Sequence, residues 1–281
     1  MTRRITSESR PRLLLLAPHS DDIAYSLGAT LLSPGWKTHY DLDIVTVFTR
    51  SSHAPYLSTT SASEITCVRT EEDRIYADTI GARWIGGPFG ETTTRGYPDT
   101  RSIYLVRDPR DDQIFAEVRD FLTPMMSTGN GYRMVVAPLG IGGHIEHQIV
   151  FRIVCDHAEI PALFYEDQPY AADFSDYYLN RIVDSLLGAH RNGLVCASER
   201  FLSEKISRLS IYRSQFGPGD EEPLLTYCEN RRPGDKVRWL TDPPNMRAAE
   251  VLWGSEDTID LVSGDLARFV SDQHPRARDQ T

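Results

Sequence analysis

Short apolar runs of strand type alternate along this chain with segments that have the spacing of amphipathic helices, and no other feature restricts the fold as strongly. The apolar runs cover residues 13–17, 42–49, 133–137 and 162–165. The segments with helical spacing cover residues 22–32, 64–80, 111–122 and 144–157. Strands that alternate with helices are typical of parallel sheets buried on both faces. We therefore expect an α/β fold with a Rossmann-like, mostly parallel sheet and helices on both faces.

The pattern changes at residue 171, beyond which it shows no further strand-type runs. Two later segments have helical spacing, 174–187 and 202–216. We expect a single domain over 13–281, with a core at about 13–170 and a smaller, helical or mixed C-terminal cap region at about 171–281. Residues 1–12 are polar, with several serines and arginines, and this predicts a loose N-terminal arm.

The composition argues against several classes of partner. The 281 residues include 30 basic and 40 acidic ones, and the net charge of -10 disfavours binding to nucleic acid or anionic lipid. The aliphatic run at 13–17 is far shorter than the ~20 residues of a membrane span, so we expect a cytoplasmic protein. Four cysteines without Cys-x-x-Cys spacing indicate neither a disulfide framework nor a thiolate metal site. The composition leaves open whether the protein forms a homo-oligomer.

Polar side chains follow the first strand-type run, where a parallel sheet opens its ligand crevice. His19, Asp21 and Asp22 lie in this predicted strand-to-helix turn. One aspartate is explained by capping of the following helix, but two carboxylates and a histidine are not. His19 and Asp22 can face one metal ion while Asp21 points to a water molecule beside it.

A second polar group follows the third strand-type run, after a glycine-rich segment. His144 and His147 are three residues apart at the start of a predicted helix, so both project from one face toward the same crevice, and Glu146 lies between them. His19, Asp22 and His147 would supply two imidazoles and one carboxylate. Such a set leaves a position open for water, as catalytic zinc sites do.

These two loops resemble the motifs of the PIG-L or LmbE-like de-N-acetylases, zinc enzymes that hydrolyse the N-acetyl group of glucosamine-containing compounds and related amides. Residues 17–22, Ala-Pro-His-Ser-Asp-Asp, are similar to the family's His-Pro-Asp-Asp loop, and residues 143–147, Gly-His-Ile-Glu-His, to its His-x-Asp-His loop. Weaker similarities occur in the same order at 68–73, 164–171 and 212–215. The resemblance extends from about residue 13 to 216.

The resemblance implies one Zn²⁺ per chain, bound by His19, Asp22 and His147, with Asp21 as the general base. It also implies that His144 stabilises or protonates the tetrahedral intermediate and is oriented by Glu146. A carboxylate that accepts a hydrogen bond from His144 would raise the pKa of the imidazole and keep it protonated near neutral pH. On this basis, Glu146→Gln should retain zinc.

Three departures from the family pattern stand at or beside these residues. Ser20 replaces a proline, Glu146 replaces an aspartate, and Gly142 stands where some members have a tyrosine. Arg69 is one residue of the weaker similarities, and the resemblance implies that it contacts substrate. Its ordinary interpretation is a surface ion pair with Glu72, three residues further along the same predicted helix.

The sequence thus predicts a zinc-dependent hydrolase that removes an N-acetyl or similar N-acyl group from a small substrate. The amine could belong to a sugar, an aminocyclitol, a cysteine conjugate or another natural-product intermediate. One alternative is a metal-dependent hydrolase of another bond, such as a phosphoester or another amide. Another is a sugar-nucleotide-binding Rossmann-type protein such as a glycosyltransferase. Its Gly-x-Gly-x-x-Gly fingerprint would begin at Gly140 and Gly142, but the position of the third glycine is Ile145. A binding module without catalytic activity is the third.

Overall fold

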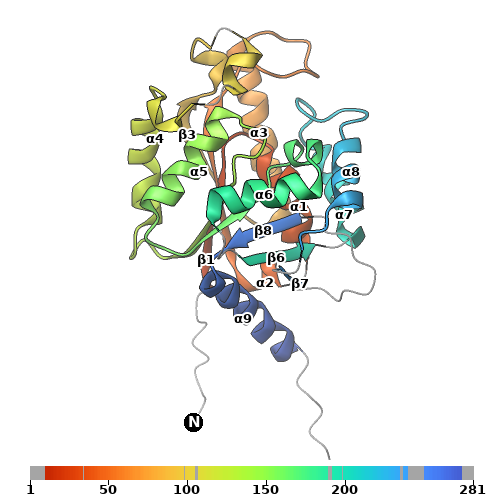
Figure 1. Ribbon diagram of the computed structural model, residues 1–281. Coiled ribbons are helices and arrows are strands. Elements are labelled where there is room, and N and C mark those ends of the chain that lie inside the picture. Colours follow the sequence, from red (N-terminus) through yellow and green to blue (C-terminus); the bar gives the residue numbers. More distant parts are fainter. Residues whose placement is uncertain are drawn as a thin grey trace, which may run out of the picture.

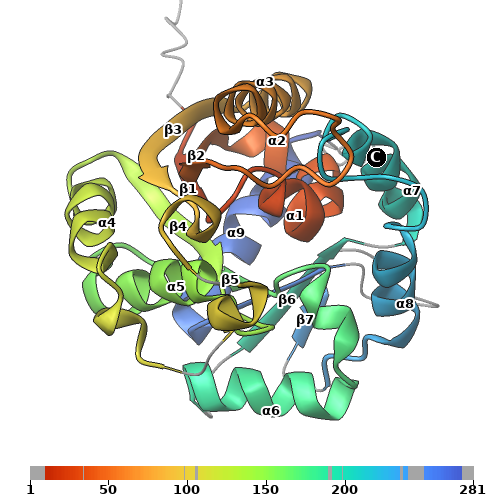
Figure 2. The same ribbon diagram turned by 90° about the horizontal axis from the view of Figure 1, so that it is seen from above.

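An eight-stranded sheet with helices on both faces organises the protein (Figures 1 and 2). The computed structural model describes residues 10–33, 35–97, 99–104, 107–188, 192–197, 199–234, 237–239 and 250–273. The strands are β1 (Arg12–Ala17), β2 (Asp41–Arg50), β3 (Arg83–Gly90), β4 (Tyr132–Pro138), β5 (Ala162–Tyr165), β6 (Asn192–Ala197), β7 (Val237–Trp239) and β8 (Glu250–Gly254). The helices are α1 (Asp22–Leu32), α2 (Trp36–His39), α3 (Ala62–Ile80), α4 (Phe115–Leu122), α5 (Ile145–His157), α6 (Asp176–Leu187), α7 (Glu199–Leu209), α8 (Glu222–Asn230) and α9 (Glu256–Gln273).

The strand order reverses its direction between the neighbouring strands β1 and β4. The sheet has the order β3-β2-β1-β4-β5-β8-β6-β7, and only β8 runs antiparallel to its neighbours, β5 and β6. From β1 the chain first continues outward to β2 and β3, and then returns to β4 on the other side of β1. The segments that follow β1 and β4 therefore leave the same edge of the sheet in opposite directions, which is where open parallel sheets bind ligands.

The core has two layers, one on each face of the sheet. Leu14 and Leu16 of β1 belong to the layer under α4, α5 and α6, whereas Leu13 and Leu15 belong to the layer under α1, α2, α3 and α9. All four leucines are fully buried. This explains why the first strand is a continuous aliphatic run rather than an alternating one, because a central parallel strand has no solvent face.

The predicted fold class and the first four predicted strands are confirmed, with small changes at their ends. The predicted helices at 22–32, 64–80 and 144–157 correspond to α1, α3 and α5. The segment predicted at 111–122 contains α4, which begins only at Phe115 after a 3₁₀ turn at Pro109–Asp111. One strand of this half, β3, was not predicted because its sequence includes Gly86, Gly87 and Pro88. These residues are tolerated since β3 lies at the edge of the sheet.

The sequence pattern indicates no strand after residue 171, but the structure has three there, so this region is mixed rather than helical. Strands β6, β7 and β8 all belong to the main sheet, and β8 is inserted between β5 and β6. Each of them is short. β7 has only three residues, and β8 is buried at all five positions and therefore lacks the alternation that identifies a half-exposed strand. The sheet thus runs through both the expected core and the expected cap region. Residues 1–9 of the expected arm lie outside the described residues.

None of the described helices combines the length and apolar character that a membrane crossing requires.

The helix predicted at 202–216 corresponds to α7, which spans Glu199–Leu209. Its C-terminal end is followed by Tyr212, whose hydroxyl donates a hydrogen bond to Asp73 of α3 at 3.1 Å. The segment after α7 is therefore anchored by a side-chain contact rather than by further helix.

Candidate metal centre and active-site pocket

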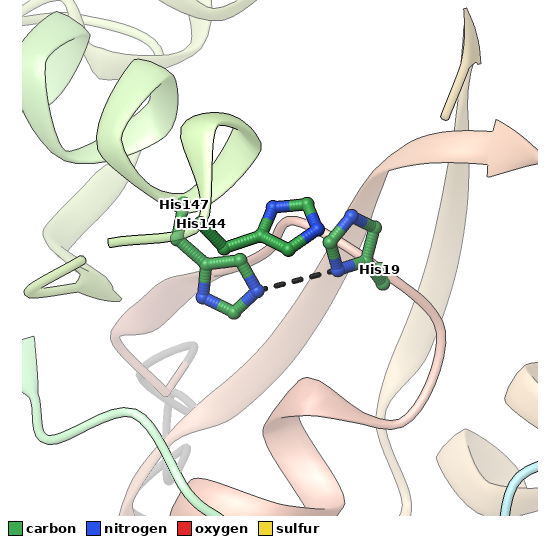
Figure 3. A group of neighbouring side chains, drawn as sticks. All are labelled: His19, His144 and His147. Carbon is green, nitrogen blue, oxygen red and sulfur yellow. Dashed lines mark hydrogen bonds between the residues drawn. The ribbon is translucent and has the colours of Figure 1, made fainter. Parts of the chain in front are cut away.

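The loops after β1 and β4 bring three histidines together (Figure 3). His19 lies in the loop between β1 and α1, His147 in the first turn of α5, and His144 at the N-cap position of that helix. The i,i+3 spacing puts His144 and His147 on one side of the helix start, facing His19. The sheet topology explains the meeting, since β1 and β4 are hydrogen-bonded neighbours although 128 residues separate His19 from His147.

Three donor atoms converge on one point beside these rings. Asp22 Oδ2 lies 3.6 Å from His19 Nδ1 and 3.5 Å from His147 Nε2. The two imidazole nitrogens are 3.2 Å apart, along the dashed line in Figure 3. Ligands at about 2.0–2.1 Å in a tetrahedral zinc site are separated by roughly 3.3–3.4 Å. The three predicted ligands therefore have the mutual spacing that a tetrahedral divalent ion requires.

When both imidazoles are neutral, their hydrogen-bond partners leave a lone pair on each of the two facing nitrogens. His19 Nε2 lies 2.7 Å from Glu146 Oε2, and His147 Nδ1 lies 2.7 Å from Asp167 Oδ1. Each ring thus donates its far N–H to a carboxylate. In that neutral form the near nitrogens and the carboxylate oxygen of Asp22 are all acceptors, whereas without an ion the raised pKa of His147 favours a proton between the two rings. Such a set of convergent acceptors is stabilised by a cation, as at metal sites with carboxylate–histidine pairs.

His144 offers a second arrangement of donors around the same point. One nitrogen from each of His19, His144 and His147 lies within 4.8 Å of the others. However, His144 Nδ1 accepts a hydrogen bond from the backbone N–H of Glu146 at 3.3 Å, which caps α5. The spacing of His19, Asp22 and His147 is tighter and closer to that of a tetrahedral site. His144 lines the pocket next to them.

Asp21 has an unusual backbone conformation. Its φ of 89° is the only positive φ of a non-glycine residue among those the structure describes. It occupies the N-cap position of α1, yet its side chain makes no capping hydrogen bond and instead lines the pocket. Ordinary helix capping therefore does not account for Asp21. Backbone strain of this kind is concentrated at functional sites, where it sets the direction of a side chain.

Burial and neighbouring charges shift the pKa values at this centre in opposite directions. Burial raises the pKa of Asp22 to about 6 and that of Glu91 to about 7. Burial and the neighbouring histidines lower the pKa of His144 to about 2. Burial would also lower the pKa of His147, but Asp22 and Asp167 outweigh it and raise this pKa to about 9. A divalent ion would stabilise the charged form of such clustered, buried carboxylates.

The expectation that Glu146 accepts a hydrogen bond from His144 is wrong. The fully buried Glu146 carboxylate accepts hydrogen bonds from His19 Nε2, from the backbone N–H of Thr92 and from Arg95. His144 Nδ1 accepts the backbone N–H of Glu146 instead. The proposed rise in the pKa of His144 is likewise contradicted, because burial and nearby positive charge lower it.

Arg69 of α3 is buried rather than part of a surface ion pair. Its guanidinium lies 3.1 Å from Glu91 and donates hydrogen bonds to Ser51 Oγ and to the carbonyl oxygen of His53. Glu72, the partner expected from the spacing, accepts hydrogen bonds from Ser214 instead. Arg69 also lines the pocket, so it lies where a substrate contact is geometrically available.

Two contributors were not found by sequence reasoning. Asp167, two residues after β5, was not predicted as a site residue, but it is fully buried and holds His147 through Nδ1. Tyr170 fills the space beside Gly142, where a Cβ would lie 2.7 Å from that of the tyrosine. Its ring packs edge-on against His147, with the ring centres 5.6 Å apart. Both residues fall in the segment 164–171, whose similarity to the family was the available signal.

Most of these side chains line a pocket of about 580 Å³, and His147 and Asp167 lie behind its lining. Its walls come from the loop after β1, the segment after β3, the N-terminus of α5, the segment after β5 and the chain before α8. The lining residues are His19, Asp21, Asp22, Tyr25, His53, Arg69, Glu91, Thr92, Thr93, Tyr97, Asp99, Ile103, Tyr104, His144, Glu146, Gln168, Pro169, Tyr170, Gln215, Asp220 and Pro223. The volume is sufficient for a small molecule.

Several known proteins with similar sequences or structures are deacetylases. The chain is 30% identical over 243 residues to the 2'-N-acetylparomamine deacetylase of Streptomyces fradiae, an alignment that covers 82% of this chain and 81% of that protein. A pseudoaglycone deacetylase has a similar structure, with a TM-score of 0.61, 22% identity and coverage of 88% of this chain and 97% of that one. The zinc inhibited form of teicoplanin deacetylase is also similar, with a TM-score of 0.60, 20% identity and coverage of 88% and 99%.

No family model matches the chain. The solved structures, being less than 25% identical, support the fold alone, and the family follows from the Streptomyces fradiae relative together with the two loops described above. The sequence motifs, their meeting at the β1–β4 crevice and this relative agree. The chain belongs to the LmbE/PIG-L-like family of N-deacetylases.

Proposed function

We propose that the protein is a zinc-dependent hydrolase that removes an N-acetyl group from a small amino-sugar-like molecule. The observation that carries the proposal is the convergence of His19 Nδ1, Asp22 Oδ2 and His147 Nε2 within 3.2–3.6 Å of one another, with both imidazoles held by carboxylates on their far sides. Two nitrogens and one oxygen suit Zn²⁺ and leave its fourth position open.

The residues around the proposed ion have complementary roles in amide hydrolysis. When bound, Zn²⁺ lowers the pKa of a coordinated water and polarises the amide carbonyl. Asp21, directed into the pocket by its strained backbone, accepts a proton from the attacking water. His144 keeps its proton on Nε2, because Nδ1 is an acceptor for the N–H of Glu146, and can therefore donate a hydrogen bond as a neutral imidazole.

The charge of the pocket supports a substrate that carries a further amine. Among the titratable lining residues, six are carboxylates and one is a guanidinium. Arg69 is paired with Glu91, whereas Asp99 and Asp220 take part in no ion pair within the described residues. A protonated amine on the substrate would be attracted by these carboxylates. The relative from Streptomyces fradiae is named for an N-acetylated paromamine.

The reaction is tested directly by incubating the zinc-loaded protein with small N-acetylated amino sugars and measuring acetate and free amine by mass spectrometry. We expect both products in equal amounts, and none with His147→Ala, which should retain the fold but contain less than one tenth of the zinc. Absence of acetate from every acetamide offered to folded, zinc-loaded protein contradicts the proposal. Release of phosphate from phosphoesters under the same conditions would favour the alternative hydrolase.

The amine preference is tested with a pair of N-acetylated sugars that differ by one free amine in place of a hydroxyl. We expect the amine-bearing compound to have a kcat/KM about 10-fold higher, the order of one favourable charge contact. Asp220→Asn should reduce this ratio by lowering only the kcat/KM of the amine-bearing compound. Equal values for both compounds with the wild-type protein would contradict the preference while leaving the deacetylase proposal intact.

A further inference from the structure

We infer that Glu146 is a positioning residue for the metal ligand His19, and that it joins this ligand to the pocket wall at Thr92–Arg95. The inference rests on the proposed function only in taking His19 as a ligand. Its starting point is the carboxyl group of Glu146, which is fully buried. A buried carboxylate needs strong hydrogen-bond partners, and those of Glu146 come from three different segments of the chain.

Each oxygen of Glu146 has a separate task. Oε2 accepts the N–H of His19 Nε2 at 2.7 Å. Oε1 accepts the backbone N–H of Thr92 at 2.7 Å and the Arg95 guanidinium at 2.8 Å. Arg95 is held in turn by Asp112 at 2.8 Å. All three partners donate hydrogen bonds to Glu146, so both of its side-chain oxygens must act as acceptors.

The consequence for His19 is a defined tautomer. While Oε2 accepts from Nε2, the proton of the neutral ring stays on Nε2 and the Nδ1 lone pair points toward Asp22 and His147. An amide at position 146 can supply only one acceptor. If its oxygen serves Thr92 and Arg95, its NH₂ group opposes His19 Nε2–H, and the ring must either turn or move its proton to Nδ1, where it blocks the metal.

The same carboxylate fixes the segment that begins with Thr92. This segment supplies Thr92, Thr93, Tyr97 and, further along, Tyr104 to the lining of the pocket. Its first backbone N–H and Arg95 are both bound to Glu146, so the wall of the substrate pocket and the ring of His19 are oriented by one group.

A carboxylate that accepts a hydrogen bond from a metal-ligating histidine contributes about 10–100-fold to metal affinity in zinc proteins.

The test measures zinc affinity rather than activity, by competition with a chromophoric chelator. Glu146→Gln is compared with Glu91→Gln, which makes the same change at another buried carboxylate of the pocket that contacts Arg69 and Ser51 but no proposed ligand. We expect about 10–100-fold weaker zinc binding for Glu146→Gln and less than 3-fold for Glu91→Gln. Equal affinities for Glu146→Gln and wild type overturn the inference, as does an equal loss in both variants.

A measurement on the wild-type protein keeps the inference testable if Glu146→Gln does not fold. Nitrogen-15 NMR of the histidine rings reports which nitrogen carries the proton and which binds zinc. We expect His19 to retain a protonated Nε2 and to coordinate through Nδ1. Coordination through Nε2 overturns the role of Glu146 even if acetate is released, whereas zinc bound at Nδ1 without any deacetylase activity would contradict the proposed function alone.

Discussion

Asp21 illustrates at the scale of one residue how local strain and chemistry coincide. Its positive φ places the chain in a region that Asn and Asp tolerate better than other non-glycine residues. Because Asp22 already supplies the carboxylate near the two imidazoles, the Asp21 side chain remains available in the pocket. The two neighbouring aspartates therefore have separate surroundings within one turn.

We predict that Asp21→Asn keeps the metal and lowers kcat by about 10²–10⁴, the range for loss of a general base. Asparagine tolerates the same backbone conformation, so the loop should keep its shape. Elemental analysis and kinetics on the same preparation test both parts. Loss of zinc from this variant, or unchanged hydrolysis, would mean that Asp21 and Asp22 have each other's roles. Asp22→Asn is the matched variant and should lose zinc.

At the scale of elements, the loop between β4 and α5 determines how closely Tyr170 approaches the centre. Gly142 has a φ of 87°, and a Cβ there would lie 2.7 Å from Cβ of Tyr170. Gly143 has a φ of 81° but only the distant Gln148 amide near its missing Cβ, at 3.7 Å. The two glycines therefore share the conformational requirement, and only Gly142 also needs the space.

We predict that Gly142→Ala reduces kcat/KM by more than 10-fold relative to Gly143→Ala, because only the first displaces Tyr170 from His147. The strain of a left-handed residue should cost both variants about 1–2 kcal/mol of stability. The clash with Tyr170 adds a further cost to Gly142→Ala alone. Urea unfolding measures the stability of both variants, and steady-state kinetics measure the difference in kcat/KM. Equal kinetics in the two variants would indicate that the position of Tyr170 does not affect the reaction.

At the scale of the whole molecule, hydrogen bonds and a buried ion pair connect the C-terminal half to α1, the helix that begins with Asp22. Glu250 of β8 accepts hydrogen bonds from the backbone N–H groups of Ala29 and Thr30 in α1. Lys205 of α7, which is 1% exposed, lies 2.8 Å from Glu250 and 3.0 Å from Gln168 of the pocket lining. This buried ion pair connects α1, α7, β8 and the pocket.

We predict that Lys205→Met lowers the free energy of unfolding by about 3–5 kcal/mol, because it leaves the Glu250 charge buried without its partner. The exposed pair of Arg238 and Asp260 provides the control, and Arg238→Met should cost less than about 1 kcal/mol. Chemical denaturation of the metal-free proteins measures both values. A similar small loss in both variants would show that the C-terminal half contributes to the sheet without being fixed to α1 by this pair.

The sequence by itself determined the class of the fold and the residues that meet at the site. Period-dependent patterns identified the central strands and helices, and the i,i+3 spacing of His144 and His147 directed both toward His19 and Asp22. Such inferences succeed because they depend on neighbours along the chain and on the general rule that parallel strands end at one edge. Among the strands missed after residue 171, β7 has only three residues and β8 is buried at every position, so neither gives a clear periodic signal.

Only the tertiary structure decided which carboxylate serves which imidazole. The carboxylate of Glu146 bonds to His19, which is 127 residues away, rather than to the ring of its neighbour His144, and Asp167 holds His147 from the segment after another strand. Hydrogen bonds form only within a few tenths of an ångström of an ideal distance and in narrow directions. These limits depend on how several packed elements place their loops in space, and no local pattern of residues contains that information.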